Sequence, residues 1–211
     1  MRDVTKEKVG GIVLCGGKSS RMGRPKPWLP FGAGTMLQHV IGILREVVAP
    51  IVVVAAPGQK LPSLDDDVLL TFDDEKNLGP LAGLAAGLSA LSQQAEAAYT
   101  SSCDVPFLKP AFVRKMIEVL GDHEIAMPRQ DQYHHPLAAV YRTCIEDRVR
   151  QLLAQERMRP VYLLDECDAQ VVDVEELRCV DSQLSSLRNI NTREEYEAAL
   201  QESIPGSGAS S

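Results

Sequence analysis

Residues 9–26 read VGGIVLCGGKSSRMGRPK, a short apolar run that continues into a loop rich in glycine, serine and basic residues. The run Val9–Leu14 predicts a buried β-strand. Gly16, Gly17 and Gly23 let the backbone of the loop approach a ligand, and successive N–H groups there can bind an anion. The stretch therefore predicts a strand whose carboxyl end carries an anion-binding loop.

The order of an apolar run followed by a helical pattern repeats along the chain. Further strands are expected at residues 51–55, 69–72, 98–102, 124–127, 137–141 and 171–174. Helices are expected at 36–47 behind the capping Thr35, at 80–91, at 110–120, near 144–154, and after the capping box of Thr192 and Glu195. This alternation predicts an α/β fold, a single-domain Rossmann-like three-layer sandwich with a mostly parallel sheet. Ligands of such folds bind beyond the carboxyl ends of the strands.

The composition is that of an ordinary globular chain with an excess of acidic residues. Its 211 residues suit one domain, expected over 8–202, and the tail 203–211, SIPGSGASS, is typical of a disordered segment. The net charge of −7 disfavours binding to nucleic acid. The five cysteines lack CxxC spacing and indicate reduced thiols. Because the charged N-terminus is unlike a signal peptide and no apolar run is long enough for a membrane helix, we expect a cytoplasmic protein without a membrane partner.

The loop after the first strand carries a high density of positive charge. Lys18, Arg21, Arg24 and Lys26 stand close together in an acidic chain. We favour binding of nucleotide phosphates over a solvated basic loop, because the cluster directly follows a strand. Two familiar phosphate motifs do not fit, since Ile12 stands where a P-loop needs its first glycine and no GxGxxG fingerprint occurs.

Two further stretches contain candidate site residues. Asp104 follows a predicted strand in the sequence CDVP, where a carboxylate can hold Mg²⁺ together with substrate phosphates, or can serve as the aspartate of a turn. Gly79, Gly83 and Gly87 keep one face of the helix after Asp73 thin. Close packing of that helix on the sheet explains these glycines as well as a ligand does.

Five segments of the chain occur in the same order as similar segments of a known family. They are LCGGKSSRMGRPK at 14–26, the GPLAGL stretch within 73–88, CDVPFL at 103–108, HHPLAAVY at 134–141 and NINTREEY at 189–196. In this order they resemble the MobA-type molybdenum cofactor guanylyltransferases. The resemblance implies a nucleotidyltransferase domain of the nucleotide-diphospho-sugar transferase type. It also implies transfer of GMP from GTP to the phosphate of molybdopterin, with Mg²⁺ as cofactor, release of pyrophosphate, and molybdoenzyme-maturation proteins as partners.

The same resemblance implies which residues bind the nucleotide. Leu14, Cys15 and Gly16 would contact the guanine through their backbone, and Gly17 would bind the nucleotide beside them. Asp73, the acidic residue before the GPLAG sequence, would line the same part of the site.

A second set of residues is implied at the reacting phosphates. Lys26 would neutralise the triphosphate with help from Arg21, and Asp104 would bind Mg²⁺ beside the α-phosphate, so these three are the implied catalytic residues. Asn189 and Asn191 would lie on the side of the pterin phosphate. Attack of one phosphate on another brings two anions together, and cations at that point offset their repulsion.

Three features depart from the family pattern. Cys15 stands where the family has alanine, and Ala55 and Ala56 stand where relatives carry an asparagine after the second strand. The sequence RPKPWLPFG at 24–32 is more similar to cytidylyltransferases, so transfer of CMP to molybdopterin or to another small phosphorylated substrate is the alternative function. Gly16 favours guanine, because a methyl group at that position would crowd the larger base.

An alternative outside the enzymes is a catalytically silent nucleotide-binding adaptor. The presence of both Lys26 and Asp104 opposes it, since a silent relative has no need of either. His134 and His135 are adjacent and do not suit a metal pair, but they could contact the pterin from a loop. Trp28 is expected to be a packing residue rather than a platform for the base.

Overall fold

A computed structural model of the protein describes residues 8–16, 24–73 and 79–203. Within these ranges eight strands form one sheet in the order β10-β7-β9-β6-β1-β4-β5, with β8 paired to β7. The strands are β1 Val9–Leu14, β4 Ile51–Ala55, β5 Val68–Phe72, β6 Ala97–Ser102, β7 Ile125–Gln130, β8 Tyr133–His134, β9 Ala138–Arg142 and β10 Ala169–Asp173. Every strand expected from the sequence is present close to its expected bounds, and β8 is added to them.

The sheet is mostly parallel, as expected. β1 runs parallel to β4 and β6, β4 runs parallel to β5, and β10 runs parallel to β7. β9 is antiparallel to both β6 and β7. The connection between Gln130 and Ala138 contains only the short β8, whereas a parallel pair needs a crossover of about a dozen residues or more. The short connection therefore accounts for the reversed direction of β9.

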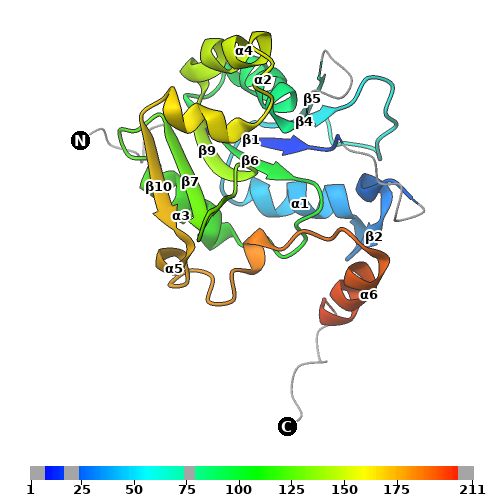
Figure 1. Ribbon diagram of the computed structural model, residues 1–211. Coiled ribbons are helices and arrows are strands. Elements are labelled where there is room, and N and C mark those ends of the chain that lie inside the picture. The colour runs from blue at the N-terminus through cyan, green and yellow to red at the C-terminus, as the bar shows by residue number, and fades with distance from the viewer. Residues whose placement is uncertain (1–7, 17–23, 74–78, 204–211) are drawn as a thin grey trace.

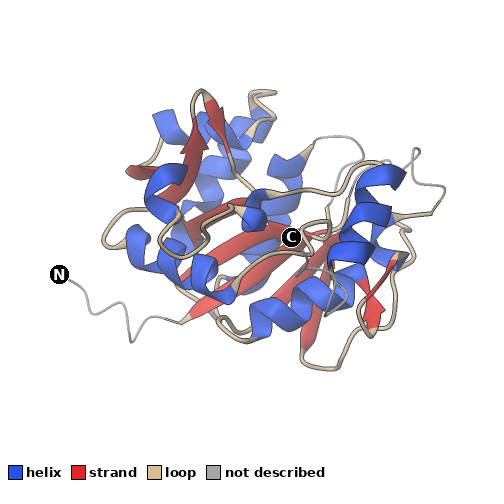
Figure 2. Cartoon of the chain, turned by 90° about the horizontal axis from the view of Figure 1, so that it is seen from below, coloured by secondary structure: helices blue, strands red, loops and turns tan. Residues whose placement is uncertain are grey.

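Helices cover both faces of the sheet and complete the three-layer sandwich (Figure 1 and Figure 2). α1 and α3 pack into one buried cluster, and α2 and α4 pack into a second cluster on the other face. The helices are α1 Met36–Arg45, α2 Pro80–Leu91, α3 Pro110–Leu120, α4 Glu146–Ala154, α5 Val174–Leu177 and α6 Arg193–Glu202, with 3₁₀ turns η2 Lys26–Trp28, η3 Thr143–Ile145, η4 Pro160–Asp165 and η5 Ser185–Leu187. None of the helices in the described ranges is both long and apolar enough to cross a membrane.

Local sequence signals set the ends of the helices. Thr35 caps α1, and Gln38 completes a capping box with it. Thr192 and Glu195 form the expected capping box of α6. Gly121 ends α3 with a φ of 48°, a backbone conformation that suits glycine. These ends depend on neighbouring residues alone, which explains why the sequence predicts them well.

Two expected boundaries differ from the structure. Val47 lies beyond α1, in a turn where its amide bonds to the carbonyl of Leu44, yet it packs against the same cluster as the helix. Apolar spacing therefore could not separate it from the helix. Val174, expected in a strand, begins α5 because the side chain of Asp173 accepts a hydrogen bond from the amide of Glu175 at 2.9 Å.

The glycines of α2 are explained by its packing on β1. A Cβ at Gly87 would lie 2.7 Å from Cγ2 of Ile12, and a Cβ at Gly83 would lie 3.1 Å from Cδ2 of Leu14. Both distances are shorter than the separation at which carbon atoms attract each other. Of the two explanations that the sequence left open, close packing on the sheet is therefore the one observed for Gly83 and Gly87. Gly79 does not lie on this face, because it precedes α2 as its cap with a φ of 72°.

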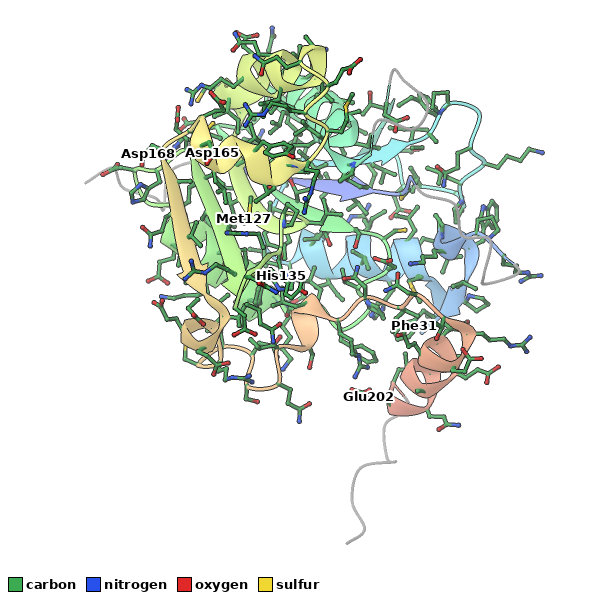
Figure 3. The ribbon with its side chains drawn as sticks, in the orientation of Figure 1. Phe31, Met127, His135, Asp165, Asp168 and Glu202 are labelled. Atoms are coloured by element: carbon green, nitrogen blue, oxygen red, sulfur yellow. The ribbon has the colours of Figure 1, made fainter. Side chains whose placement is uncertain are left out.

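α6 packs against the segment that follows the glycine-rich loop, and Figure 3 shows Phe31 beside this helix. The contact is a separate buried cluster of Leu29, Phe31, Met36, Ile190 and Ala199. The hydroxyl of Tyr196 also donates to the carbonyl of Pro30 at 2.5 Å. A small hairpin of β2 Pro30–Phe31 and β3 Gly34–Thr35, not expected from the sequence, forms this segment. The C-terminal helix is thereby held next to η2, which carries Lys26.

Candidate active site

The candidate site lies at one edge of the sheet, where four parallel strands end. Leu14, Ala55, Phe72 and Ser102 are the last residues of β1, β4, β5 and β6. After β1 the chain crosses toward β4, whereas after β6 it crosses in the opposite direction, toward β7. Loops that diverge in this way leave a crevice at the strand ends, where open α/β sheets bind their ligands.

Asp104 is the centre of the polar contacts at the end of β6. It is 8% exposed, and both of its carboxylate oxygens accept hydrogen bonds. Oδ2 accepts from the ammonium of Lys26 at 2.5 Å, and Oδ1 accepts from the hydroxyl of Ser102 at 2.5 Å. The side-chain amide of Asn189 donates to the same Oδ1 at 2.8 Å. Ser102 is a site residue that the sequence reading did not single out, although a residue two positions before Asp104 shares its side of the strand end.

Asn191 brings a second oxygen to the ammonium of Lys26. Its Oδ1 lies 2.8 Å from Nζ. The amide of Ile190 donates to the carbonyl of Asp104 at 2.9 Å, and the carboxylate of Glu195 accepts from the amide of Asn191 at 2.6 Å. The capping box that starts α6 therefore also fixes the backbone of this asparagine at the site.

The oxygens around Nζ of Lys26 form an arrangement that suits a hard cation. Oδ2 of Asp104 and Oδ1 of Asn191 both contact one ammonium, so a positive charge already stands between a carboxylate and an amide oxygen. Mg²⁺ prefers oxygen ligands and usually takes one or two carboxylates plus substrate phosphates. No cluster of three or more His, Cys, Asp and Glu side chains in the described residues could hold a metal by itself. The residues present thus fit a metal that shares its ligands with the substrate.

Gly16 and Asp73 approach each other above the end of β4. A Cβ placed on Gly16 would lie 3.9 Å from Oδ2 of Asp73. The amide of Asp73 donates to the carbonyl of Ala55 at 3.1 Å, which holds the residue at the edge of the sheet. The structure therefore brings together two residues that the family resemblance assigns to the nucleotide.

The backbone of Leu14 and Cys15 is largely engaged in the sheet. The amide of Cys15 donates to the carbonyl of Val54 at 2.8 Å, and the carbonyl of Leu14 accepts from the amide of Cys103 at 3.1 Å. Both residues are buried, whereas Gly16 is exposed. A ligand at this edge consequently meets the backbone of Gly16 first.

The expected site residues therefore form two groups in the crevice. One group is centred on Asp104 at the end of β6, and the other on Gly16 at the end of β1. Gly17 and Arg21, which were expected to join them, lie outside the described residues.

Cys15 and Cys103 lie between the two groups. Both are buried, and a hydrogen bond with the Cys103 thiol, together with burial, raises the pKa of Cys15 well above its ordinary value. A thiol with a raised pKa keeps its proton at neutral pH and is a poor nucleophile. We therefore treat both as small buried side chains.

His134, His135 and Trp28 differ in their surroundings. His134 belongs to β8 and His135 follows it, and burial lowers the pKa of both rings. Both rings are thus neutral at pH 7. The indole of Trp28 donates to the carbonyl of Lys60 at 2.9 Å, but the side chain is 40% exposed, so Trp28 is not the packing residue expected from the sequence.

An α/β sheet whose strand ends bring together a lysine, a buried carboxylate and an exposed glycine backbone has the architecture of the nucleotidyltransferase class of enzymes. The chain belongs to the MobA-like NTP transferase domain family, whose model matches residues 11–170. The resemblance stated from the sequence is therefore confirmed.

Individual relatives agree with this family. A probable molybdenum cofactor guanylyltransferase of Mycobacterium tuberculosis is 37% identical over 198 residues, which cover 92% of this chain and 94% of that protein. The crystal structure of molybdopterin-guanine dinucleotide biosynthesis protein A from Archaeoglobus fulgidus matches with a TM-score of 0.73 at 23% identity, covering 92% of this chain and 97% of that one. A Mycobacterium tuberculosis protein crystallised in complex with manganese matches with a TM-score of 0.56 at 17% identity, covering 93% and 100%. Both crystal structures have the same fold as this chain.

Proposed function

We propose that this enzyme transfers GMP from GTP to the phosphate of molybdopterin and releases pyrophosphate. The observation that carries the proposal is the position of the Lys26 ammonium between Oδ2 of Asp104 and Oδ1 of Asn191, with Asn189 donating to the other carboxylate oxygen of Asp104. A relative that is 37% identical over 92% of the chain is named a probable molybdenum cofactor guanylyltransferase, and this name supports the choice of substrates.

Asp104 and Asn191 are the residues that would hold Mg²⁺. Their oxygens contact a positively charged nitrogen in the structure, and a related fold has been crystallised with manganese, which supports a divalent cation of this kind. When bound, such an ion supplies positive charge that stabilises the negative charge developing at the α-phosphate. Asn189 and Ser102 keep the carboxylate of Asp104 oriented toward this position.

Lys26 is proposed to bind the triphosphate. Lys26 follows the glycine-rich loop in the sequence, and its side chain is 17% exposed, so a phosphate oxygen can reach the ammonium with little water between them. Arg21 and Gly17 of the same loop are proposed to contribute to phosphate binding. The base would lie over Gly16, between Leu14 and Cys15 on one side and Asp73 on the other.

The reaction needs positive charge more than it needs an acid or a base. An oxygen of the molybdopterin phosphate attacks the α-phosphorus of GTP, a new P–O bond forms, and the bond to pyrophosphate breaks. Because the attacking oxygen is already anionic, no side chain has to remove a proton. Lys26 offsets the charge of the triphosphate and of the leaving pyrophosphate.

Competition between GTP and CTP for transfer to purified molybdopterin tests the proposal. We expect the guanine dinucleotide to be the main product when both nucleotides are present. A preference for CTP would favour the cytidylyltransferase alternative, which the sequence at 24–32 supports, and would leave the nucleotidyltransferase class intact. Binding of GTP without any transfer would favour a silent adaptor.

The proposed setting is the cytoplasm, with molybdoenzyme-maturation proteins as recipients of the product. Five cysteines without CxxC spacing support a reducing compartment, and so does a nucleotide as substrate.

A further inference from the structure

The side chain of Gln59 interrupts the pairing of β1 and β4 at the crevice. In a parallel ladder, a residue donates its amide to one residue of the partner strand and accepts, at its carbonyl, from the amide two residues further along that strand. The amide of Cys15 donates to the carbonyl of Val54, so the carbonyl of Cys15 would be expected to accept from the amide of Ala56. Here the amide of Ala56 donates to Oε1 of Gln59 at 3.0 Å, and Nε2 of Gln59 donates to the carbonyl of Cys15 at 2.9 Å. A side-chain amide thus takes the place of the next ladder bond.

The local sequence explains why Gln59 can do this. The amide of Gln59 donates to the carbonyl of Ala56 at 2.9 Å, and Gly58 between them has a φ of 76°. Pro57 at the second position and a glycine with positive φ at the third are typical of a type II turn. The turn folds the chain back so that Gln59 bonds both polar backbone groups of Ala56.

The residue after Gln59 is tied to the other end of the glycine-rich loop. The carbonyl of Lys60 accepts from the indole of Trp28, which lies in η2 together with Lys26. The dipeptide of Gln59 and Lys60 therefore contacts Cys15, just before the loop, and Trp28, just after it. The turn that contains Gln59 and Lys60 therefore contacts the chain on both sides of the segment 16–25.

We propose that Gln59 is a positioning residue for nucleotide binding, an inference that rests on the proposed function. The side-chain amide of Gln59 lies between the ends of β1 and β4 and keeps them apart by the width of one amide group. It thereby sets the orientation of the Cys15 carbonyl and of Gly16, the next residue. The backbone that we propose meets the base is then already oriented before the base arrives. Without this group the strands can close on each other by forming the direct bond from Ala56 to Cys15.

The variants Q59A and Q59E test the role against the control Q94E. Gln94 is exposed after α2 and bonds a helix carbonyl through its Nε2, so Q94E makes the same chemical change away from the site. In Q59E the carboxylate cannot donate to the Cys15 carbonyl, but the protonated acid can. We expect both Gln59 variants to bind GTP about tenfold more weakly than the wild type at pH 8, which corresponds to about one lost hydrogen bond. Q94E should bind as the wild type does.

The dependence of binding on pH separates positioning from a merely structural role. The ratio of Q59E affinity to wild-type affinity, measured by calorimetry, should rise toward one as the pH falls from 8 to about 4.3, the ordinary pKa of a glutamate, where the new carboxyl takes up a proton. The ratio for Q59A should stay constant. In hydrogen-exchange measurements without nucleotide, the amide of Ala56 should exchange at a different rate in Q59A than in the wild type.

Two outcomes overturn different claims. Wild-type affinity for GTP in both Gln59 variants at both pH values overturns the positioning role, even when the enzyme transfers GMP normally. Failure of the wild type to bind any nucleoside triphosphate overturns the proposed function, and with it the role of Gln59. Altered exchange of Ala56, weaker GTP binding and recovery at low pH together support the role.

Discussion

The ammonium of Lys26 lies 2.5 Å from Oδ2 of Asp104, although 78 residues separate the two in the chain. Their side chains are only 17% and 11% exposed, so each is the counter-ion of the other in a place where water screens little charge. Removing either partner leaves a partly buried charge behind. The pair therefore contributes to folding stability as well as to the proposed chemistry. For each variant of Lys26 or Asp104, both the free energy of unfolding and the activity must be measured.

Asp104→Asn should lose most turnover and keep the fold. Asparagine retains an oxygen for Ser102 and Asn189 but removes the charge that holds a cation, so we expect kcat to fall about a hundredfold or more. GTP binding in EDTA should persist. Pyrophosphate release reports kcat, and Asp66→Asn, in the exposed loop before β5, is the matched control. Turnover near that of the wild type would remove Asp104 from the mechanism.

Lys26→Ala should weaken binding of GTP far more than binding of guanosine. A lysine that acts on the triphosphate contributes little once the phosphates are gone. Titration calorimetry with both ligands measures the difference. Lys115→Ala, which breaks an exposed ion pair with Glu118 on α3, should affect neither ligand. Equal losses for GTP and guanosine would place Lys26 away from the phosphates.

Gly16→Ala should reduce the preference for GTP over CTP without reducing stability. The new Cβ would lie 3.9 Å from Asp73, an ordinary contact, so the free protein accommodates it. A base that approaches the backbone at Gly16 meets the methyl group, and unpaired polar groups then cost about 1–3 kcal/mol. We expect kcat/KM for GTP to fall roughly tenfold or more, and CTP to suffer less. Gly42→Ala, in open space on α1, is the control. An unchanged nucleotide preference would argue against base contacts at Gly16.

Gly87→Ala should destabilise the fold, in contrast to Gly16→Ala. Its Cβ would lie 2.7 Å from Cγ2 of Ile12, a fully buried side chain that cannot move aside freely. We expect a loss of about 1–3 kcal/mol in the free energy of unfolding, measured by urea denaturation. The gain in helix propensity from alanine, about 1 kcal/mol, offsets part of the strain. Stability equal to that of the wild type would mean that α2 can shift away from β1.

The stability of the protein should decrease as the pH falls below about 6.5, in part because of His135. Burial, with a smaller effect from His134, lowers the pKa of His135 in the folded state. The unfolded chain therefore takes up its proton first, so this contribution is complete above the unfolded pKa and is lost as the pH falls through the folded pKa. His135→Gln should flatten the decline in unfolding free energy between pH 7 and 5.5. An identical decline in His135→Gln would assign the effect to other groups.

The order of strands and helices could be predicted from the sequence because its signals are local. Short apolar runs, Pro80 and Pro110 at helix starts, and Thr35 and Thr192 as caps act over a few residues. The antiparallel direction of β9 follows from the short connection after β7, which a pattern of apolar runs does not reveal.

The site was predicted in part. The family resemblance named Lys26, Asp104 and Asn191, whose side chains lie in contact, but it could not state that the ammonium lies between the oxygens of the other two. The contact between Gln59 and Cys15 could not be predicted from the sequence, because it spans 44 residues and depends on the register of two strands. A side chain that replaces one ladder bond leaves no periodic pattern in the sequence.

Asn189 and Asn191 come from a segment that a ribosome synthesises after the last strand, β10, has been made. Before this segment is made, the strands and Lys26 and Asp104 are already present in the chain, but the partners that Asn189 and Asn191 supply to Asp104 and Lys26 are absent. α6 then docks through Tyr196 and closes the arrangement. A chain that stops before this segment is expected to contain every strand of the described sheet but to lack both asparagines of the proposed site.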